Sequence, residues 1–143
     1  MPDDMRSIAH DPVDPYEREM LFSFKYLDAA CESYSLDRCD RREHYVSQLL
    51  PRLCHLSRMT IKAFKGERSK ALRSHPINWD EIKNHDGFGT IPETNEQLYA
   101  ASQSDAYQFA VTANEYGRVA GFFIDNVFHV VWLDPDHLLY PDA

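Results

Sequence analysis

The sequence lacks long apolar runs and pairable cysteines. No stretch of its 143 residues approaches the roughly 18 consecutive apolar residues of a membrane-spanning helix. Residues 1–19 are acidic and have neither the basic nor the apolar region of a secretion signal. Cys31, Cys39 and Cys54 are odd in number and show no Cys-x-x-Cys spacing, which excludes a disulfide scaffold. We therefore expect a soluble, cytoplasmic protein with no membrane partner.

Repeats and low-complexity tracts are also absent, and the composition is that of a folded chain. Hydrophobic residues make up 43% and aromatic residues 13% of the sequence, which is enough to bury a core and excludes wholesale disorder. A length of 143 residues fits one domain. Prolines and acidic residues within residues 1–19 predict a flexible acidic arm, followed by a single domain over residues 20–143.

Basic residues are in the minority, and their distribution is uneven. The net charge of −8 argues against a protein that coats nucleic acid or an anionic membrane with its whole surface. Residues 41–75, however, contain nine Lys or Arg residues against two acidic ones, whereas the segments on either side are strongly acidic. Such a basic segment is either a local phosphate-binding face or the solvated face of a helix balanced by acidic neighbours.

The first half of the domain predicts a strand followed by two helices. Alternating aromatic residues over residues 21–27 are typical of a strand. A capping-box pattern begins a helix near residue 40, and its apolar stripe continues to residue 56. Pro51 lies within that stripe and predicts a kink or a break. A second short helix is expected over residues 61–65.

The second half predicts mainly strands. Three β-rich runs separated by turn residues are expected to form an antiparallel meander, over residues 107–112, 117–125 and 127–133. The last run is apolar on both faces, with Trp132 expected beside Phe128 and Val130, as in a central strand. Weaker patterns predict a short strand over residues 76–79 and a helix over residues 94–101. The expected fold is therefore α+β, with an N-terminal strand, a helical pair and a C-terminal three-stranded antiparallel meander forming one sheet.

The meander resembles that of a known family. The segments Tyr-Gly-Arg-Val-Ala-Gly-Phe at residues 116–122 and Phe-His-Val-Val-Trp at residues 128–132 resemble strands of the RelE/YoeB/ParE toxin superfamily. In its ribosome-dependent RNases, an Arg on this strand and a His or Tyr after the final strand flank the scissile phosphate. The resemblance implies these roles for Arg118, His137 and Tyr140. The chain departs from the family in its length, its acidity and the lack of a counterpart to the glutamate that some members use. Its C-terminal ending also resembles that of small uncharacterised prokaryotic proteins.

The same residues suit RNA cleavage on chemical grounds. Attack by a 2′-hydroxyl needs a base, an acid for the 5′-oxygen and a cation for the developing phosphorane. Arg118, the only Lys or Arg in residues 84–143, would supply the cation. His137 would move the proton, and Tyr140 would stack on a base or donate to a phosphate. Alternatively, His137 is a turn residue that caps strand carbonyls. Arg118 would instead form an ion pair with one of three carboxylates, Glu115, Asp125 or Asp134.

Neither a metal nor an organic cofactor is expected. His129, Asp134, Asp136 and His137 offer nitrogen and oxygen ligands close together in the sequence. Strand rise, however, separates His129 from the other three by roughly 16 Å. Cys54 is expected to be a buried residue of the apolar helix face rather than a nucleophile.

The basic segment offers candidate binding residues, which are Arg41, Arg42, Arg52, Arg58, Lys62, Lys65 and Arg68. An exposed face of this kind would bind RNA phosphates with salt-sensitive affinity. It would equally bind an acidic protein partner, including the acidic part of a second copy in a homodimer. One predicted function is a RelE/YoeB-like toxin, a metal-independent endoribonuclease that cleaves mRNA on the ribosome and is paired with a cognate antitoxin. The other is a catalytically inert protein-interaction module on the same fold, in phage defence, anti-defence or immunity.

Overall fold

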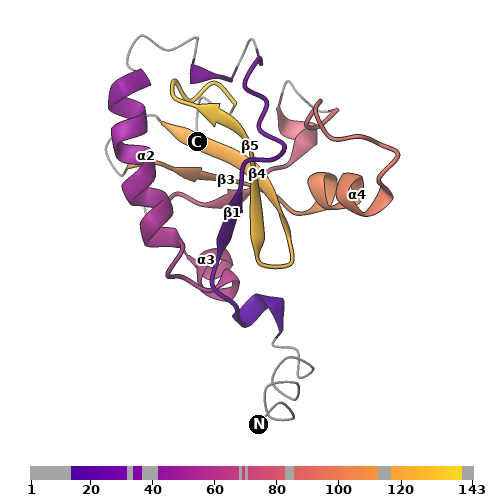
Figure 1. The fold of residues 1–143 in the computed structure, drawn as a ribbon, viewed down its shortest axis with the longest axis horizontal. Coiled ribbons are helices and arrows are strands. Elements are labelled where there is room, and N and C mark those ends of the chain that lie inside the picture. Colours follow the sequence, from indigo (N-terminus) through magenta and orange to yellow (C-terminus); the bar gives the residue numbers. More distant parts are fainter. Residues whose placement is uncertain are drawn as a thin grey trace.

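The fold is built around a five-stranded sheet in the order β1-β5-β4-β3-β2 (Figure 1). The computed structural model describes residues 14–31, 34–36, 42–67, 69, 71–82, 86–112 and 117–139. The strands are β1 (Leu21–Ser23), β2 (His75–Pro76), β3 (Ala106–Ala110), β4 (Arg118–Ile124) and β5 (Val127–Asp134). The helices are α2 (Arg42–Leu56), α3 (Ile61–Gly66) and α4 (Glu96–Ser104), and two 3-10 turns are η1 (Pro15–Glu17) and η3 (Trp79–Glu81).

The sheet is mixed. β3, β4 and β5 form the predicted antiparallel meander, which confirms the α+β class and the C-terminal part of the prediction. β1 lies at one edge and pairs in parallel with β5, so that Leu21 is opposite Val127. β2 lies at the other edge, antiparallel to β3, so that His75 is opposite Gln108. The meander is therefore flanked by two short strands from distant parts of the chain.

β1 ends earlier than the alternation over residues 21–27 predicts. The amide of Lys25 donates a hydrogen bond to Ser23 Oγ at 3.2 Å. The amide of Leu27 donates to the carbonyl oxygen of Phe24 at 3.1 Å. These two bonds turn the chain away from the sheet edge, so Phe24 is exposed rather than packed in a strand.

α2 is continuous through Pro51, so the predicted break does not occur. Its buried side chains recur at three- and four-residue spacing and are Tyr45, Leu49, Leu53 and Leu56. Cys54 follows Leu53 by about 100° around the helix axis. It is exposed, and the prediction that Cys54 is buried is therefore wrong.

Side-chain caps begin the two shorter helices. Thr60 accepts a hydrogen bond from the amide of Ala63 at 3.0 Å, which confirms the predicted start of α3. The amide of Leu98 donates to Asn95 Oδ1 at 3.2 Å, so α4 begins two residues later than the predicted helix over residues 94–101. Within the described residues, no helix has the length and apolar character needed to cross a bilayer.

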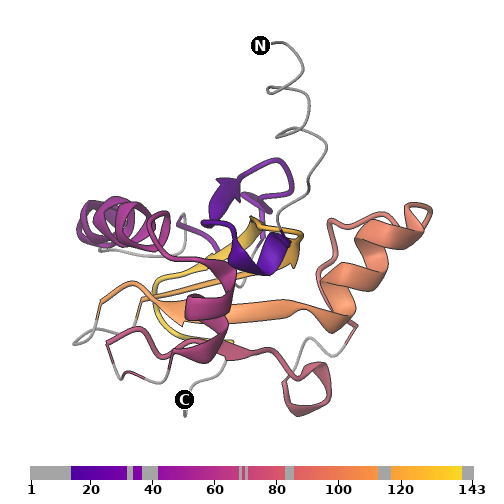
Figure 2. The same cartoon turned by 90° about the horizontal axis from the view of Figure 1, so that it is seen from below.

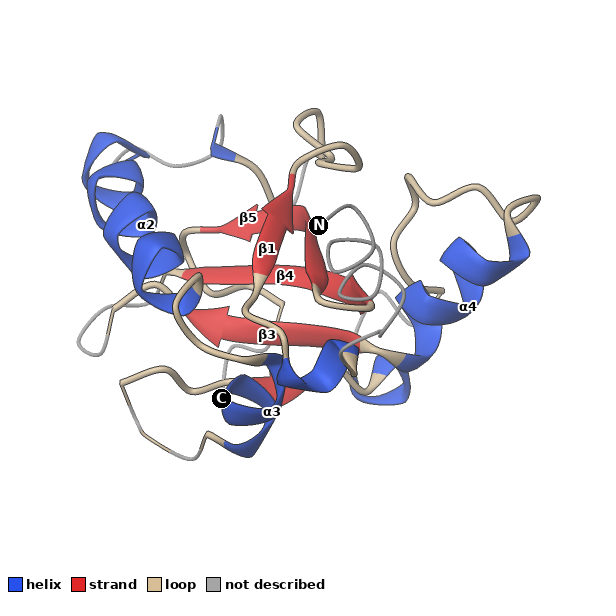
Figure 3. Ribbon diagram, turned by 60° about the horizontal axis from the view of Figure 1, so that its bottom comes forward, coloured by secondary structure: helices blue, strands red, loops and turns tan. Residues whose placement is uncertain are grey.

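Apolar side chains pack on both faces of the sheet. α2 and α3 cover one face, where the Phe64 ring lies edge-on to Phe109, with ring centroids 6.0 Å apart. The other face is covered by α4 and by the segment around η3. There the Phe88 ring centroid lies 4.8 Å from that of Trp79 and 4.7 Å from that of Trp132. Figures 2 and 3 show α2 and α4 at opposite ends of the strands. The sheet end near α2 is therefore opposite the end at which the chain passes from α4 into β3.

Part of the predicted N-terminal arm contacts α3. The amide of Ile61 donates to the carbonyl oxygen of Arg18 at 3.0 Å. Lys65 Nζ lies 5.4 Å from the centre of the Tyr16 ring and 2.8 Å from Asp105 Oδ1. Residues 14–19 are thus tied to the domain, and residues 1–13 of the arm lie outside the described residues.

A β-bulge interrupts β5. The pairing of β4 with β5 shifts so that Val131 becomes an extra residue. As a result, Trp132 shares a face with Val131, and Leu133 joins Phe128 on the opposite face. The prediction that Trp132 lies beside Phe128 is therefore wrong, because one extra residue reverses the alternation beyond it.

Replacing Gly121, which lies at this bulge, with alanine is expected to lower the free energy of unfolding by about 2 to 3 kcal/mol. A Cβ atom there would overlap the carbonyl oxygen of His129 and lie 2.8 Å from the Phe128 ring. Urea unfolding measures the change. Gly89→Ala is the control, because a Cβ atom at Gly89 meets nothing within 4 Å. Equal losses in the two variants would contradict this explanation.

Candidate functional site

The candidate site lies where four segments form one row across the sheet. The amide of Ala110 donates to the carbonyl oxygen of Leu72 at 2.7 Å. Ala110 is opposite Arg118, and Arg118 is opposite Asp134. Neighbouring strands lie about 4.8 Å apart, so Arg118 is one strand from Asp134 and two from Leu72. The start of β4, the end of β5 and the segment before β2 therefore meet at the sheet end near α2.

Arg118 is the buried cation of this row. Its side chain is 4% exposed, and Nη1 donates to the carbonyl oxygen of Gly117 at 3.1 Å. Its own carbonyl oxygen accepts a hydrogen bond from the Tyr45 hydroxyl at 2.7 Å, which ties α2 to β4. Burial lowers the pKa of Arg118, the charge of Arg73 lowers it further, and Asp134 acts in the opposite direction.

The three predicted ion-pair candidates for Arg118 are placed very differently. Asp134 is its cross-strand neighbour. Asp125 lies in the β4–β5 turn at the far end of the strand. Glu115 lies outside the described residues. Of the two described carboxylates, only Asp134 acts on the pKa of Arg118.

Asp134 holds the turn that follows β5. Its Oδ1 accepts the amide of Leu138 and its Oδ2 accepts the amide of Leu139, both at 2.9 Å. The side chain is 1% exposed, and burial raises its pKa, while the two amides and Arg118 act in the opposite direction. Both carboxylate oxygens are therefore engaged in fixing the position of His137.

His137 is a buried imidazole in a positive environment. Its backbone has a φ of 58°, in the left-handed region, and its amide donates to the Asp134 carbonyl oxygen at 3.3 Å. Burial is the largest cause that lowers the pKa of His137 to about 4, followed by the charges of Arg118, Arg73 and His75. At neutral pH, His137 is therefore an uncharged imidazole among cationic side chains, which is the form that accepts a proton.

Arg73 and His75 belong to this site, although the sequence pattern does not link them to Arg118. His75 Nδ1 lies 2.9 Å from the Pro76 carbonyl oxygen, which can only accept, so Nδ1 bears the proton. In the neutral ring, Nε2 then accepts from the Gln108 amide at 3.2 Å. The segment before β2 has no clear periodicity, and its pairing with β3 is visible only in the folded sheet.

The predicted basic binding residues divide into two groups. Arg42, Arg58 and Lys62 are exposed. Arg52 and Lys65 make internal contacts instead: Arg52 donates to the carbonyl oxygens of Val111 and Ala71, both at 2.9 Å, and Lys65 pairs with Asp105. The exposed group remains available for a phosphate or an acidic partner. Three further predicted site residues, Arg41, Arg68 and Tyr140, lie outside the described residues.

His129, on β5, has a structural role. The His129 ring stacks on Phe122 at a centroid distance of 5.1 Å and lies 5.4 Å from the Tyr26 ring. Burial lowers its pKa, with a further contribution from Lys25. In the part of the chain that the structure describes, no three His, Cys, Asp or Glu side chains gather as a metal site.

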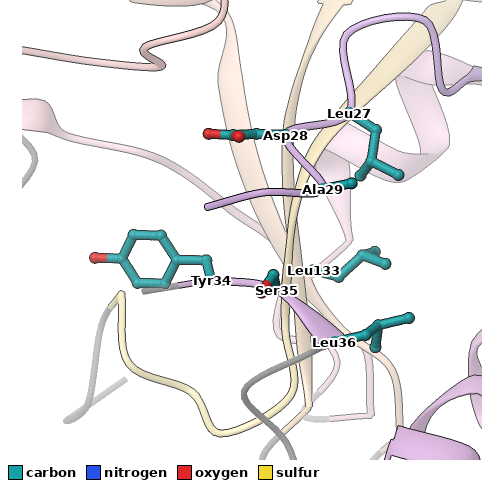
Figure 4. Close-up of a pocket in the computed structure, with 7 residues that line it drawn as sticks. All are labelled: Leu27, Asp28, Ala29, Tyr34, Ser35, Leu36 and Leu133. Atoms are coloured by element: carbon teal, nitrogen blue, oxygen red, sulfur yellow. The ribbon is translucent and has the colours of Figure 1, made fainter. Parts of the chain in front are cut away.

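An apolar pocket of about 180 Å³ lies beside the end of β5 (Figure 4). Figure 4 shows Leu27, Leu36 and Leu133 extending to one side, while the Asp28 carboxylate and the Tyr34 ring extend to the other. Trp132 Nε1 lies 3.3 Å from Asp28 Oδ2, to which it donates. The pocket therefore offers an apolar surface rather than the acid–base groups found around Arg118.

Comparisons of the chain with protein-family models, with curated proteins and with solved structures find no match. The resemblance to the RelE/YoeB/ParE superfamily stays a prediction from the residue pattern.

The free energy of unfolding is expected to decrease as the pH falls from about 6.5 toward about 4, because of His137. A histidine in an unfolded chain has a pKa near 6.5, whereas the pKa of His137 in the folded protein is about 4. Between these values the unfolded chain binds more protons, so acid favours unfolding. This contribution is complete above about pH 6.5, and its loss toward pH 4 amounts to at most about 3 kcal/mol.

Urea unfolding of the wild type and of His137→Asn at pH 7 and pH 4.5 measures this effect. Asparagine tolerates the left-handed backbone and removes the titrating ring. Because the two proteins share every other titrating group, the difference in their unfolding free energies isolates His137. A difference that is the same at both pH values would contradict the assignment.

Proposed function

We propose that this protein is a metal-independent endoribonuclease, a RelE/YoeB-like toxin that cleaves mRNA on the ribosome. The observation that supports this proposal is the sheet end at which Asp134, opposite Arg118, holds the turn with His137; burial and the charges of Arg118 and Arg73 lower the pKa of His137 there. A base and several cations at one sheet end match what a phosphodiester needs for cleavage without a metal.

The proposed reaction is an attack within the RNA chain. His137 accepts the proton of the ribose 2′-hydroxyl, and O2′ then bonds to the neighbouring phosphorus. Arg118 stabilises the negative charge of the pentavalent phosphorane. The P–O5′ bond breaks, and the His137 imidazolium gives the proton that it accepted to O5′. The products are a 2′,3′-cyclic phosphate and a 5′-hydroxyl end.

The electrostatics of the site couple substrate binding to this chemistry. An imidazole with a pKa of about 4 is available at neutral pH but is a weak base. A bound phosphodiester adds negative charge beside Arg118 and Arg73, which offsets the two cations that lower the pKa of His137. Binding of the correct substrate therefore strengthens the base.

The remaining parts of the proposal concern docking. The exposed Arg42, Arg58 and Lys62 would contact ribosomal RNA phosphates, and Tyr140 would stack on a base. A cognate antitoxin would be an acidic protein that covers the same cationic groups. The reaction would take place in the cytoplasm, where the ribosome is found.

One observation favours the alternative, a catalytically inert protein-interaction module. The Arg118 and His137 side chains are only 4% and 5% exposed, as expected of groups that stabilise the end of the sheet. In that case the exposed basic residues of α2 and α3 would bind an acidic protein or a second copy in a homodimer.

The two functions are separated by inducing the chain in a host without a partner gene and mapping mRNA 5′ ends. The wild type is expected to arrest growth and to create new 5′-hydroxyl ends. Arg118→Lys and His137→Asn are expected to cleave at least about 100-fold more slowly, because they remove the bidentate cation and the base. The same reaction with purified ribosomes and excess chelator tests the independence from metal.

His44→Gln is the matched control, because His44 is an exposed histidine in the first turn of α2. It is expected to cleave like the wild type. Thermal unfolding of every variant verifies that it is folded. Normal growth and intact mRNA with the wild type would contradict the nuclease proposal and favour the interaction module.

A further inference from the structure

Arg73 has an unusual backbone conformation and an exposed side chain. Its φ of 50° lies in the left-handed region, which is uncommon for a long side chain and occurs mainly in turns and at functional sites. The residue is exposed. Within the described ranges, its side chain makes no hydrogen bond or ion pair.

The fold brings this exposed cation next to the buried one. Arg73 directly follows Leu72, whose carbonyl oxygen is bonded to Ala110, the cross-strand neighbour of Arg118. The charge of Arg73 lowers the pKa of both Arg118 and His137, in keeping with the position of Arg73 beside this row of strands. Two arginines and an imidazole from separate segments are therefore gathered at one end of the sheet.

Among the described residues, Asp134 is the carboxylate that acts on the pKa of Arg118, and its two oxygens also accept backbone amides. Arg73 itself has no carboxylate partner among the described residues. Two guanidinium groups in mutual repulsion are stabilised when an anion binds between them.

We propose that Arg73, together with Arg118, forms a phosphate-binding site beside His137, in which Arg73 is the exposed residue that captures the ligand. This inference rests on the proposed function for its nucleic-acid ligand, but the site itself requires no cleavage. Arginine pairs match the oxygens of a phosphate group through parallel N–H donors. Phosphomonoesters and the phosphodiesters of RNA share this chemistry.

Histidine ring signals in an NMR titration provide the test, because His75 and His137 lie in the site. The full chain is titrated with inorganic phosphate at pH 6.5 and low salt, and separately with a short 2′-O-methyl RNA that cannot be cleaved. Both probes are expected to shift the signals of His75 and His137 saturably and to raise the pKa of His137. Tighter binding of the RNA identifies a nucleic-acid phosphate as the ligand, and tighter binding of inorganic phosphate identifies a small phosphorylated molecule.

Variants of Arg73 test whether phosphate binding depends on this side chain. Arg73→Ala is expected to weaken phosphate binding about tenfold, and Arg73→Lys to restore much of it, because the charge is kept and the bidentate geometry is lost. In the free protein, Arg73→Ala is also expected to raise the pKa of His137, since one repelling charge is removed. Arg18→Ala is the control, because Arg18 is an exposed arginine outside the proposed docking residues and is bonded to α3 through its backbone carbonyl oxygen.

The possible outcomes separate this inference from the nuclease proposal. Saturable phosphate binding that depends on Arg73, in a protein that leaves mRNA intact, would support the site and contradict the nuclease. RNA cleavage by the wild type, with unchanged phosphate affinity in Arg73→Ala, would support the nuclease and contradict the phosphate site. If the wild type shows no saturable shift with either probe, or if Arg18→Ala weakens binding as much as Arg73→Ala, the phosphate site is wrong.

Discussion

The buried carboxylate of Asp134 is the constraint on which the functional end of the sheet depends. A charge this deep is stable only when its oxygens are bonded, and Asp134 bonds them to the amides of Leu138 and Leu139. The turn after β5 is fixed by these bonds, and the turn places His137. The same carboxylate lies across the strand pair from Arg118 and supplies the opposing charge at that end.

Around this carboxylate, an acidic protein gathers positive charge. The chain has a net charge of −8, yet Arg118, Arg73 and His75 all act on His137 in the same direction. Burial strengthens the effect of Arg118, whose charge is shielded from water, whereas Arg73 acts from an exposed position. The repulsion favours the uncharged form of His137. The proposed RNA chemistry and the proposed phosphate site both use this excess of positive charge.

Signals close together in the sequence predict much of the fold. Alternation predicts the meander, the apolar stripe predicts α2, and the hydroxyl of Thr60 predicts the start of α3. The errors arise where distant segments intervene: an extra residue at Val131 turns Trp132 to the other face. Of the site, the family-like pattern predicts Arg118 and His137, which the fold brings together. His75 has no such signal, because β2 is only two residues long and its partner β3 lies far along the chain.

The sequence by itself determined the local structure and the charge pattern, since strand alternation, helical spacing and caps depend on residues within one or two turns of each other. Only the tertiary structure decided which segments became neighbours. Parallel pairing of β1 with β5 and the row from Leu72 through Arg118 to Asp134 join residues that are far apart in the chain. The pKa of His137 depends on burial and on three charges from other strands and loops. Register and burial arise from packing of the whole chain, and no local pattern of residues specifies them.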